Sequence, residues 1–187
     1  MNDKDKVIAW FKRLGFQPKI DNFQDKLIAQ KTVYLLQLKG LGTKFHYGFH
    51  VRGPYSRELT NELYANRRDF EQGITGIQPS AREEKVLDEF KTLFEMKPSL
   101  LEVASSYAYF IASEHLDPVE AIRKVKEVKP FISETNVAVG ISRVKEFLFP
   151  PSAKDLETAR KEHAPWQEAA ASTIERDEHE ERRNMAG

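Results

Sequence analysis

The residues of this sequence that are most suited to metal or acid–base chemistry are two histidines four positions apart, His46 and His50. They alternate with Phe45, Tyr47 and Phe49, which is the period-two pattern of a half-buried strand, so both histidines fall on one face. A zinc site would need further protein ligands close to this pair. We therefore predict two solvent-facing histidines and no metal site. An enzyme built from these histidines and carboxylates of distant helices is kept as a third hypothesis.

Local motifs of common catalytic and cofactor sites are absent from the sequence. It contains no glycine-rich phosphate loop, no GxSxG or HExxH pattern, no EF-hand loop and no cysteine. The sequence therefore predicts a non-enzymatic protein with no catalytic residues and no cofactor. A site assembled from residues far apart in the sequence leaves no such local pattern, so that case stays open.

Composition indicates one ordinary globular domain with an appendage. The chain has 187 residues, of which 40% are hydrophobic and 31% charged, and its formal net charge is zero. This balance argues against a general coating of phosphate-binding cations. The first residues lack the apolar core of a signal peptide, and no apolar run approaches the length of a membrane span. We expect a cytoplasmic protein that does not enter the membrane.

The helix expected over residues 23–39 is the centre of the predicted domain, because it is apolar over most of its circumference. Lys31 lies on its apolar face. We predict that the stem of Lys31 packs in the core while its ammonium group reaches solvent at the edge. The alternative is a semi-buried cation held ready for a carboxylate or phosphate of a partner.

A short β segment at about residues 43–52 and a turn at residues 52–56 (RGPYS) follow, and Ser56 is suited to cap the next helix. That helix is expected over about residues 57–66. Its polar side chains could read guanine and adenine edges, and the simpler interpretation is a solvated face. These nucleic-acid candidates are Arg57, Asn61, Arg67 and Arg68.

Four more helices are predicted after a loop at residues 69–81. They cover about residues 80–96, with a Ser80–Glu83 capping box, then 100–114, 117–128 and 133–149. The third should turn Val119 inward. Its outer face should carry the most basic short run of the chain, formed by Arg123, Lys124, Lys126 and Lys129. The first three of these are further nucleic-acid candidates.

Pro150-Pro151 marks the predicted domain boundary. Residues 1–149 should form a compact multi-helix domain, mainly α, and residues 150–187 a charged C-terminal helical arm. The arm has few large apolar residues and cannot close a core alone. Trp166 in this arm is a candidate contact, either docked on the body or in a homodimer through the arm, or available to a partner.

Two stretches resemble a known family. Residues 30–36 (QKTVYLL) and 52–59 (RGPYSREL) are similar to the YwgA-type uncharacterised proteins, and the resemblance spans about residues 5–148. A more distant similarity is to the SocA-like (Panacea) domain, in which a Lys-hydrophobic-Tyr helix precedes a Tyr-Gly-Pro turn; this chain has Arg52 where that family favours tyrosine. The second resemblance implies an antitoxin-like protein that binds a toxin. The positions matching its motif are Lys31, Tyr34, Arg52, Gly53, Pro54 and Tyr55.

The leading hypothesis from the sequence is a protein-interaction module in a toxin–antitoxin, phage-defence or regulatory setting. Its partner-binding candidates are the six motif positions together with Trp166. The alternative is a winged-helix-like nucleic-acid regulator that reads DNA through residues 56–68, with the basic run at 123–129 on the phosphate backbone.

Overall fold

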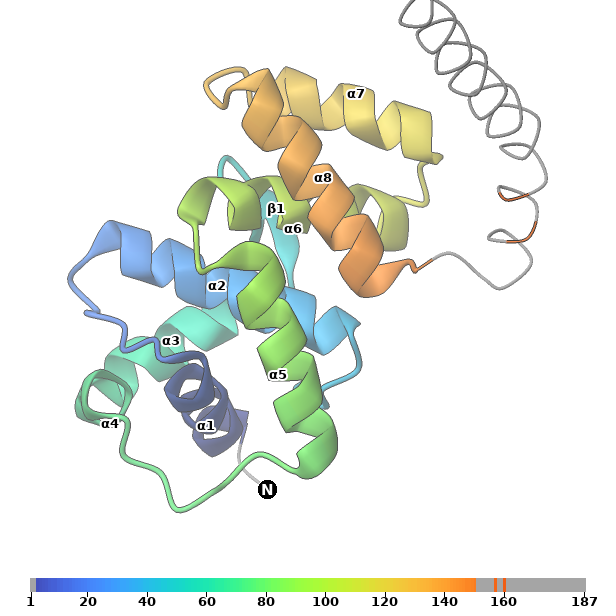
Figure 1. Ribbon diagram of the computed structural model, residues 1–187. Helices are drawn as coiled ribbons and strands as arrows, with labels where there is room; N and C mark the ends of the chain where they lie inside the picture. Colours follow the sequence, from blue (N-terminus) through green and yellow to red (C-terminus); the bar gives the residue numbers. More distant parts are fainter. Residues whose placement is uncertain (1–2, 151–156, 158–159, 161–187) are drawn as a thin grey trace, which may run out of the picture. The chain divides into compact units, whose positions relative to one another are not determined.

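The computed structural model describes residues 3–150, 157 and 160. Within these residues the chain is mainly helical, with one two-stranded antiparallel sheet, which confirms the predicted fold class. The elements are α1 (Asp3–Leu14), α2 (Phe23–Leu38), β1 (Gly48–His50), β2 (Gly53–Tyr55), α3 (Arg57–Ala65), α4 (Arg67–Gln72), α5 (Ala81–Phe94), α6 (Pro98–Ala112), α7 (Pro118–Val128) and α8 (Glu134–Leu148) (Figure 1).

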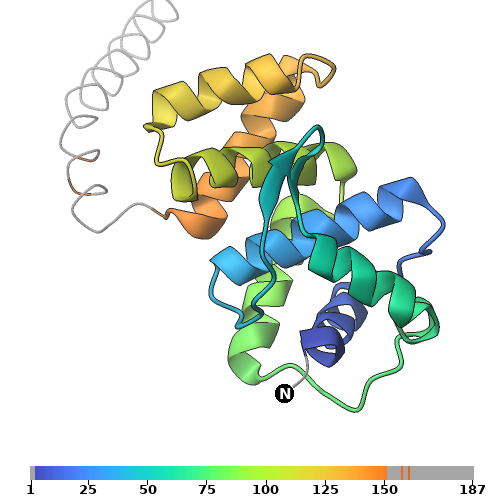
Figure 2. The same ribbon diagram turned by 180° about the vertical axis from the view of Figure 1, so that it is seen from behind.

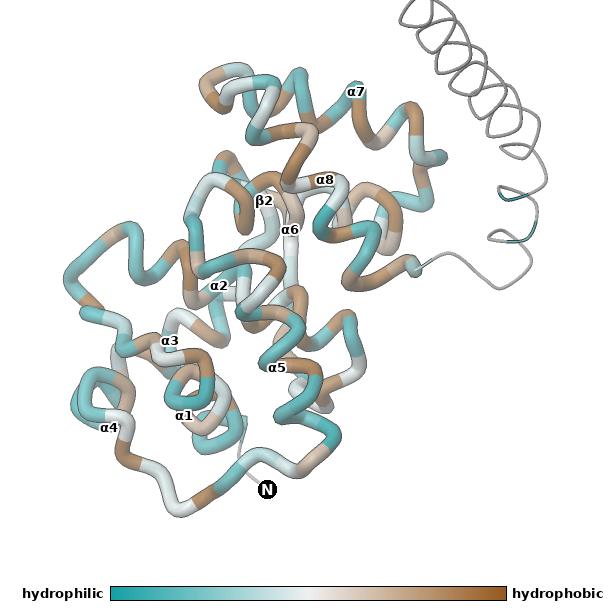
Figure 3. The backbone as a smooth tube through the Cα atoms, in the orientation of Figure 1, coloured by the Kyte–Doolittle hydropathy of each residue, from teal (hydrophilic) through white to brown (hydrophobic). Residues whose placement is uncertain are grey.

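Helix α6 lies at the centre of the domain. It packs against α8, α2, α7 and β2, and nearly every residue from Leu100 to Phe110 is buried. A helix that is apolar on almost all sides must be covered on almost all sides. Helix α2 is likewise buried on all sides from Leu27 to Leu36, whereas the short α4, mostly hydrophilic in Figure 3, buries only Phe70.

Side-chain caps start the helices at the predicted places. Ser80 and Glu83 form a complete capping box at the start of α5. The side chain of Asp117, which precedes Pro118, accepts from the backbone N–H groups of Val119 and Glu120 in α7. The hydroxyl group of Ser56 accepts from the N–H of Leu59 in α3. These caps satisfy N–H groups that the helices themselves leave free.

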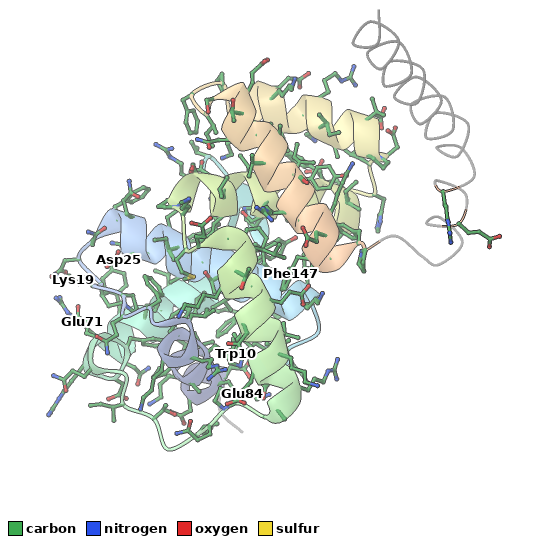
Figure 4. All side chains as sticks on the ribbon, viewed as in Figure 1. Trp10, Lys19, Asp25, Glu71, Glu84 and Phe147 are labelled. Atoms are coloured by element: carbon green, nitrogen blue, oxygen red, sulfur yellow. The ribbon has the colours of Figure 1, made fainter. Side chains whose placement is uncertain are left out.

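Helix α1 is fixed to the rest of the domain by a buried tryptophan and by carboxylates. The indole Nε1 of Trp10 donates to Glu83 Oε1 of α5 at 3.2 Å. Beyond α1, the N–H of Lys19 donates to Asp25 and that of Ile20 donates to Glu71 of α4. The labelled side chains in Figure 4 show this grouping at the start of α2 and the separate position of Trp10 between α1 and α5.

The β segment differs from the prediction in its bounds. Residues 43–47 are not part of a strand, and residues 53–55, expected within a turn, form β2. His50 pairs with Gly53, so the hairpin loop is the two residues Val51-Arg52. Gly53 has a φ of +90°, which allows so short a connection. Figure 2 shows the hairpin lying across α2.

Two further local predictions were wrong. Residues 69–72, expected at the beginning of a loop, belong to helix α4 (Arg67–Gln72), which is capped by Gly73 with a left-handed φ of +64°. Val119, expected to face inward, is 75% exposed. Val119 lies in the first turn of α7. The buried residues of this helix are Ala121 and Val125, which lie one turn apart on its inner face.

The predicted arm at residues 150–187, including Trp166, lies almost entirely outside the described residues. In the part of the chain that is described, no helix is both long enough and apolar enough to cross a membrane.

Candidate functional site

The ammonium group of Lys31 is buried, so the prediction that it reaches solvent was wrong. Lys31 of α2 is 2% exposed, and its Nζ donates to the carbonyl oxygen of Pro54 in β2 at 2.6 Å. The hairpin packs over the lysine and closes the path that its side chain would otherwise take to the surface. The periodicity of the sequence correctly places Lys31 on the inner face of α2. It does not show that Pro54, 23 residues further along the chain, covers the ammonium group.

A second buried lysine lies beneath the hairpin. Lys129, expected on the outer face of its helix, is fully buried and follows the last residue of α7. Its Nζ donates to Glu102 Oε1 at 2.8 Å and to the carbonyl oxygen of Val51 at 2.9 Å. The chain departs from helical geometry at Lys129, so the helical pattern gave the wrong face. A lone carboxylate in the apolar run of α6, Glu102, was the signal in the sequence for a buried ion pair.

Gly53 brings the hairpin into direct contact with α6. A Cβ atom at this position would lie 2.7 Å from Ser106 Oγ, 3.7 Å from Lys31 Nζ and 3.8 Å from Ser105 Oγ. The hydroxyl group of Ser106 donates to the carbonyl oxygen of Glu102 at 2.8 Å, so it is held in place. Only glycine therefore fits without displacing these buried polar groups.

Arg52 approaches the Glu102–Lys129 pair from the solvent side. Its side chain is half-exposed, lies 3.7 Å from Glu102 Oε1 and stacks over the Phe131 ring at 4.7 Å. Glu102 is thus shared by Lys129 and Arg52. The structure places Lys31 beside this group without an ion pair of its own among the described residues.

A pocket of about 410 Å³ opens between α2, α3 and the hairpin. Its lining contains the cations Lys26, Lys31 and Arg52 and the imidazole of His50, and no carboxylate. The remaining lining residues are apolar, aromatic or neutral: Phe23, Leu27, Gln30, Val51, Gly53, Tyr55, Thr60 and Tyr64. Lys31 is the one buried cation of this lining.

The rim of the pocket is aromatic and its wall is rigid. Phe23 is 60% exposed and Tyr64 is 51% exposed, and the hydroxyl oxygen of Tyr64 accepts from Lys26 Nζ at 2.8 Å. In the wall, the amide of Gln30 donates to the Ser56 carbonyl oxygen and accepts from the Ser56 N–H, both at 2.9 Å. This pair of bonds joins α2 to the start of α3.

The pKa of Lys31 is lowered to about 7, mainly by burial and also by the nearby charge of Lys129, while the charge of Glu102 opposes both. Burial also lowers the pKa of Lys129, which the hydrogen bond and charge of Glu102 oppose. At neutral pH, Lys31 is therefore close to the midpoint between its charged and neutral forms.

The structure brings some of the partner-binding candidates together and separates others. Lys31, Arg52, Gly53 and Tyr55 line the pocket, and Pro54 contributes the carbonyl that holds Lys31. Tyr34 does not line it. Its ring is buried against that of Tyr47, with centroids 4.8 Å apart, and burial raises its pKa.

Apart from His50 and Val51 of the hairpin, the pocket residues outside the motif come from the first half of α2 and from α3. Phe23, Lys26 and Gln30 are spaced along α2, and Thr60 and Tyr64 lie on α3. Nothing in the local pattern distinguishes these side chains from ordinary surface or core positions. Their grouping depends on how α3 packs against α2.

The nucleic-acid candidates of the predicted reading helix lie on two helices. Arg57 and Asn61 are exposed on α3, whereas Arg67 and Arg68 belong to α4. Arg67 pairs with Asp21 at 2.6 Å and with Glu71 at 3.0 Å.

On α7, two of the three candidates are also paired with carboxylates. Lys124 bonds Glu114, and Lys126 lies 3.8 Å from Glu134. Arg123 is exposed. Several of these charges are therefore neutralised within the chain, which reduces their attraction for phosphates.

The two histidines are exposed, as predicted, but they have different surroundings. His46 Nδ1 lies 2.9 Å from Glu58 Oε1, and the ring of His50 meets Tyr55 edge-on at 5.0 Å. Among the described residues, no group of three or more histidine and carboxylate side chains could hold a metal ion.

No protein-family model, curated protein or solved structure matches the chain. The similarity to YwgA-type and SocA-like proteins stays a prediction from the sequence motifs. The geometry of the pocket therefore carries the functional argument.

Proposed function

We propose that this chain is a non-enzymatic binding module that takes a segment of a partner protein into the pocket between α2, α3 and the hairpin. The observation that carries the proposal is a pocket lined by three cations and no carboxylate, with exposed aromatic residues at its rim. Aromatic residues that lie partly in water are common anchors of protein interfaces.

The size of the pocket suits this role. Its volume of about 410 Å³ falls within the range of roughly 300–1,000 Å³ that is usual for ligand sites. It is large enough for one or two side chains of a partner and has a mostly apolar lining with few polar groups. That combination provides apolar contact area together with orientation.

The walls of the pocket are fixed before any partner binds. Lys31 and Lys129 hold the hairpin through the carbonyl oxygens of Pro54 and Val51, and Gln30 joins α2 to α3. Because these groups are already ordered, binding costs less conformational entropy than it would at a mobile surface.

The resemblance to SocA-like domains supports a toxin–antitoxin, phage-defence or regulatory setting for this interaction. It points to a toxin or a defence component as the partner. Cytoplasmic location is part of the same proposal, because such partners act inside the cell.

The test is quantitative affinity capture from nuclease-treated native extract with the full chain. We compare the wild type with Phe23→Ala and Tyr64→Ala at the rim, and with Phe149→Ala, which removes an aromatic that is 41% exposed outside the pocket lining. We expect a stoichiometric protein that both rim variants lose and Phe149→Ala keeps. Undiminished capture by both rim variants overturns the proposal.

The nucleic-acid alternative gains no support from a specific observation, because several of its cations are already paired with carboxylates. It predicts binding that weakens steeply with salt and falls in Arg57→Ala. Absence of binding to duplex DNA at low salt removes it.

A further inference from the structure

Lys31 is a buried cation whose counter-ion is missing from the described residues. Its one hydrogen bond goes to a neutral carbonyl oxygen, and it takes part in no ion pair within that part of the chain. A charged ammonium group has three donors. The two remaining donors of the protonated form have no acceptor among the residues that the structure describes, and the side chain lines a pocket.

The nearest carboxylate is already engaged. Glu102 Oε1 accepts from Lys129 at 2.8 Å and faces Arg52 at 3.7 Å. Glu102 thus pairs with Lys129 and Arg52, and it acts on Lys31 through its charge without forming an ion pair with it. Burying an unpaired charge is costly, so an anion in the pocket would relieve a cost already present in the folded chain.

We infer that the pocket receives the side-chain carboxylate of an aspartate or glutamate from an apolar segment of the partner, and that Lys31 binds this carboxylate. The inference deepens the proposed function and rests on it, since it names the group that the partner presents. The aromatic rim contacts the apolar neighbour of the acidic residue.

A carboxylate fits the charge at the base of the pocket better than a phosphate group does. Lys31 contributes at most one positive charge there, which a carboxylate balances. A phosphomonoester carries close to two negative charges at neutral pH, and its second charge would have to be met by Arg52, which already faces Glu102, or by a cation at the rim. Lys26 stands at the rim, where Tyr64 already accepts from it.

Binding should be coupled to protonation of Lys31. The ionisable groups that face this part of α2 are Lys26, His50, Arg52, Tyr55, Glu102 and Lys129. An entering carboxylate favours the charged lysine, so its pKa rises in the complex. Above about pH 7, where Lys31 of the free protein is mostly neutral, binding takes up a proton and the affinity falls as the pH rises. The fall ends at the higher pKa of the complex, above which the lysine is neutral in both states.

The experiment is an NMR titration of the ¹⁵N-labelled full chain with two capped dipeptides, acetyl-Phe-Glu-amide and acetyl-Phe-Gln-amide, at pH 7. We expect shifts at Gln30, Gly53 and Thr60, with binding of the glutamate peptide at least about tenfold tighter, the difference expected of a charge-assisted contact. Equal affinity for the two dipeptides, or inorganic phosphate competing at lower concentration than the glutamate peptide, overturns the inference.

A variant pair and a heat measurement complete the test. Lys31→Met should abolish the preference for glutamate, whereas Lys85→Met, an exposed lysine on α5, should retain it. Calorimetry of the wild type in two buffers of different ionisation enthalpy needs no variant and should show proton uptake at pH 8. Retained preference in Lys31→Met, or no proton uptake in the wild type, contradicts the inference.

The experiments distinguish an error in the carboxylate inference from an error in the proposed function. If the rim variants lose the partner while neither dipeptide shows a preference, the binding module stands and the carboxylate assignment is wrong. If the glutamate peptide binds as expected while the rim variants keep the partner, the carboxylate site stands and its role in partner capture is wrong.

Discussion

Lys31 is the residue whose environment departs most from what its chemistry favours. An amine removed from water and placed near Lys129 loses much of its preference for the charged form. That loss is a property of the folded state alone. The pKa shift of Lys31 therefore makes a contribution of its own to the pH dependence of domain stability.

The pH dependence has a definite sign. The folded-state pKa of Lys31 is about 7, against an ordinary value of 10.5. Below pH 7 both states carry the charge, and the full cost of burying it opposes folding. Between about pH 7 and 10.5 the unfolded chain binds more protons at this group, so its contribution to stability rises with pH.

We expect the unfolding free energy of the wild type, relative to Lys31→Met, to rise between pH 7 and 9 by at most about 1.4 kcal/mol per pH unit. At pH 6 the methionine variant should be the more stable protein. Urea unfolding at pH 6, 7, 8 and 9 measures this difference, with Lys85→Met expected to show none. A difference that stays constant with pH would mean that Lys31 is not buried in its charged form.

At the same scale, Gly53 is required both for its backbone angle and for its lack of a side chain. We expect Gly53→Ala to lower the unfolding free energy by about 2 kcal/mol or more, from the strain at φ +90° and the clash with Ser106. Gly76→Ala is the control, because a Cβ there meets no atom within 4 Å. Equal effects of the two substitutions in thermal unfolding would contradict the packing described here.

At the scale of elements, the pair Glu102–Lys129 joins three parts of the chain. Glu102 belongs to α6, Lys129 ends α7, and the same ammonium group holds the hairpin loop at Val51. Removing one partner of such a buried pair leaves the other charge uncompensated. Removing both leaves a neutral cavity instead.

We therefore expect Glu102→Leu to lower the unfolding free energy by about 3–5 kcal/mol, and the double variant Glu102→Leu/Lys129→Met to recover part of that loss. Urea unfolding of the wild type, both single variants and the double variant gives the coupling energy. Additive losses in the double variant would show that the two side chains are not coupled.

The helices and strands could be predicted from the sequence where residues close together in the chain determine them. The helices around α6 followed from apolar periodicity, and Ser56, Ser80 and Asp117 marked their starts, because capping depends on neighbours in the sequence. The hairpin did not follow from such a pattern. Residues 53–55 contain the turn-forming pair Gly53-Pro54, yet they pair with β1 because α6 and α2 support them from below.

The candidate site was predictable only in part for the same reason. The motif at residues 52–55 and Lys31 were singled out, and the structure brings Lys31, Arg52, Gly53 and Tyr55 to one pocket. Lys129 was placed on the wrong face of its helix. Whether a charged side chain is buried depends on segments distant in the sequence. The residues around Lys129 do not show that Glu102, on the neighbouring helix, lies within hydrogen-bonding distance of it.

For the molecule as a whole, every buried apolar residue that the structure describes lies between Val7 and Phe147. We expect a chain of residues 1–150 to unfold cooperatively on heating and to retain the pocket, because this core closes on itself. Comparison of its melting temperature with that of the full chain measures what residues 151–187 add. Loss of cooperative unfolding in the shortened chain would contradict the predicted boundary.

The position of Trp10 also has a practical consequence. The chain has two tryptophans, and Trp10 is 1% exposed, with its indole bonded to Glu83. Substituting Trp166 by phenylalanine leaves Trp10 as the single tryptophan, whose fluorescence, excited selectively above the absorption of tyrosine, reports on the contact between α1 and α5. Its emission should be blue-shifted in the folded chain and move to the red when α1 separates from α5. The protein thus carries an intrinsic optical probe of its own folding, without any added label.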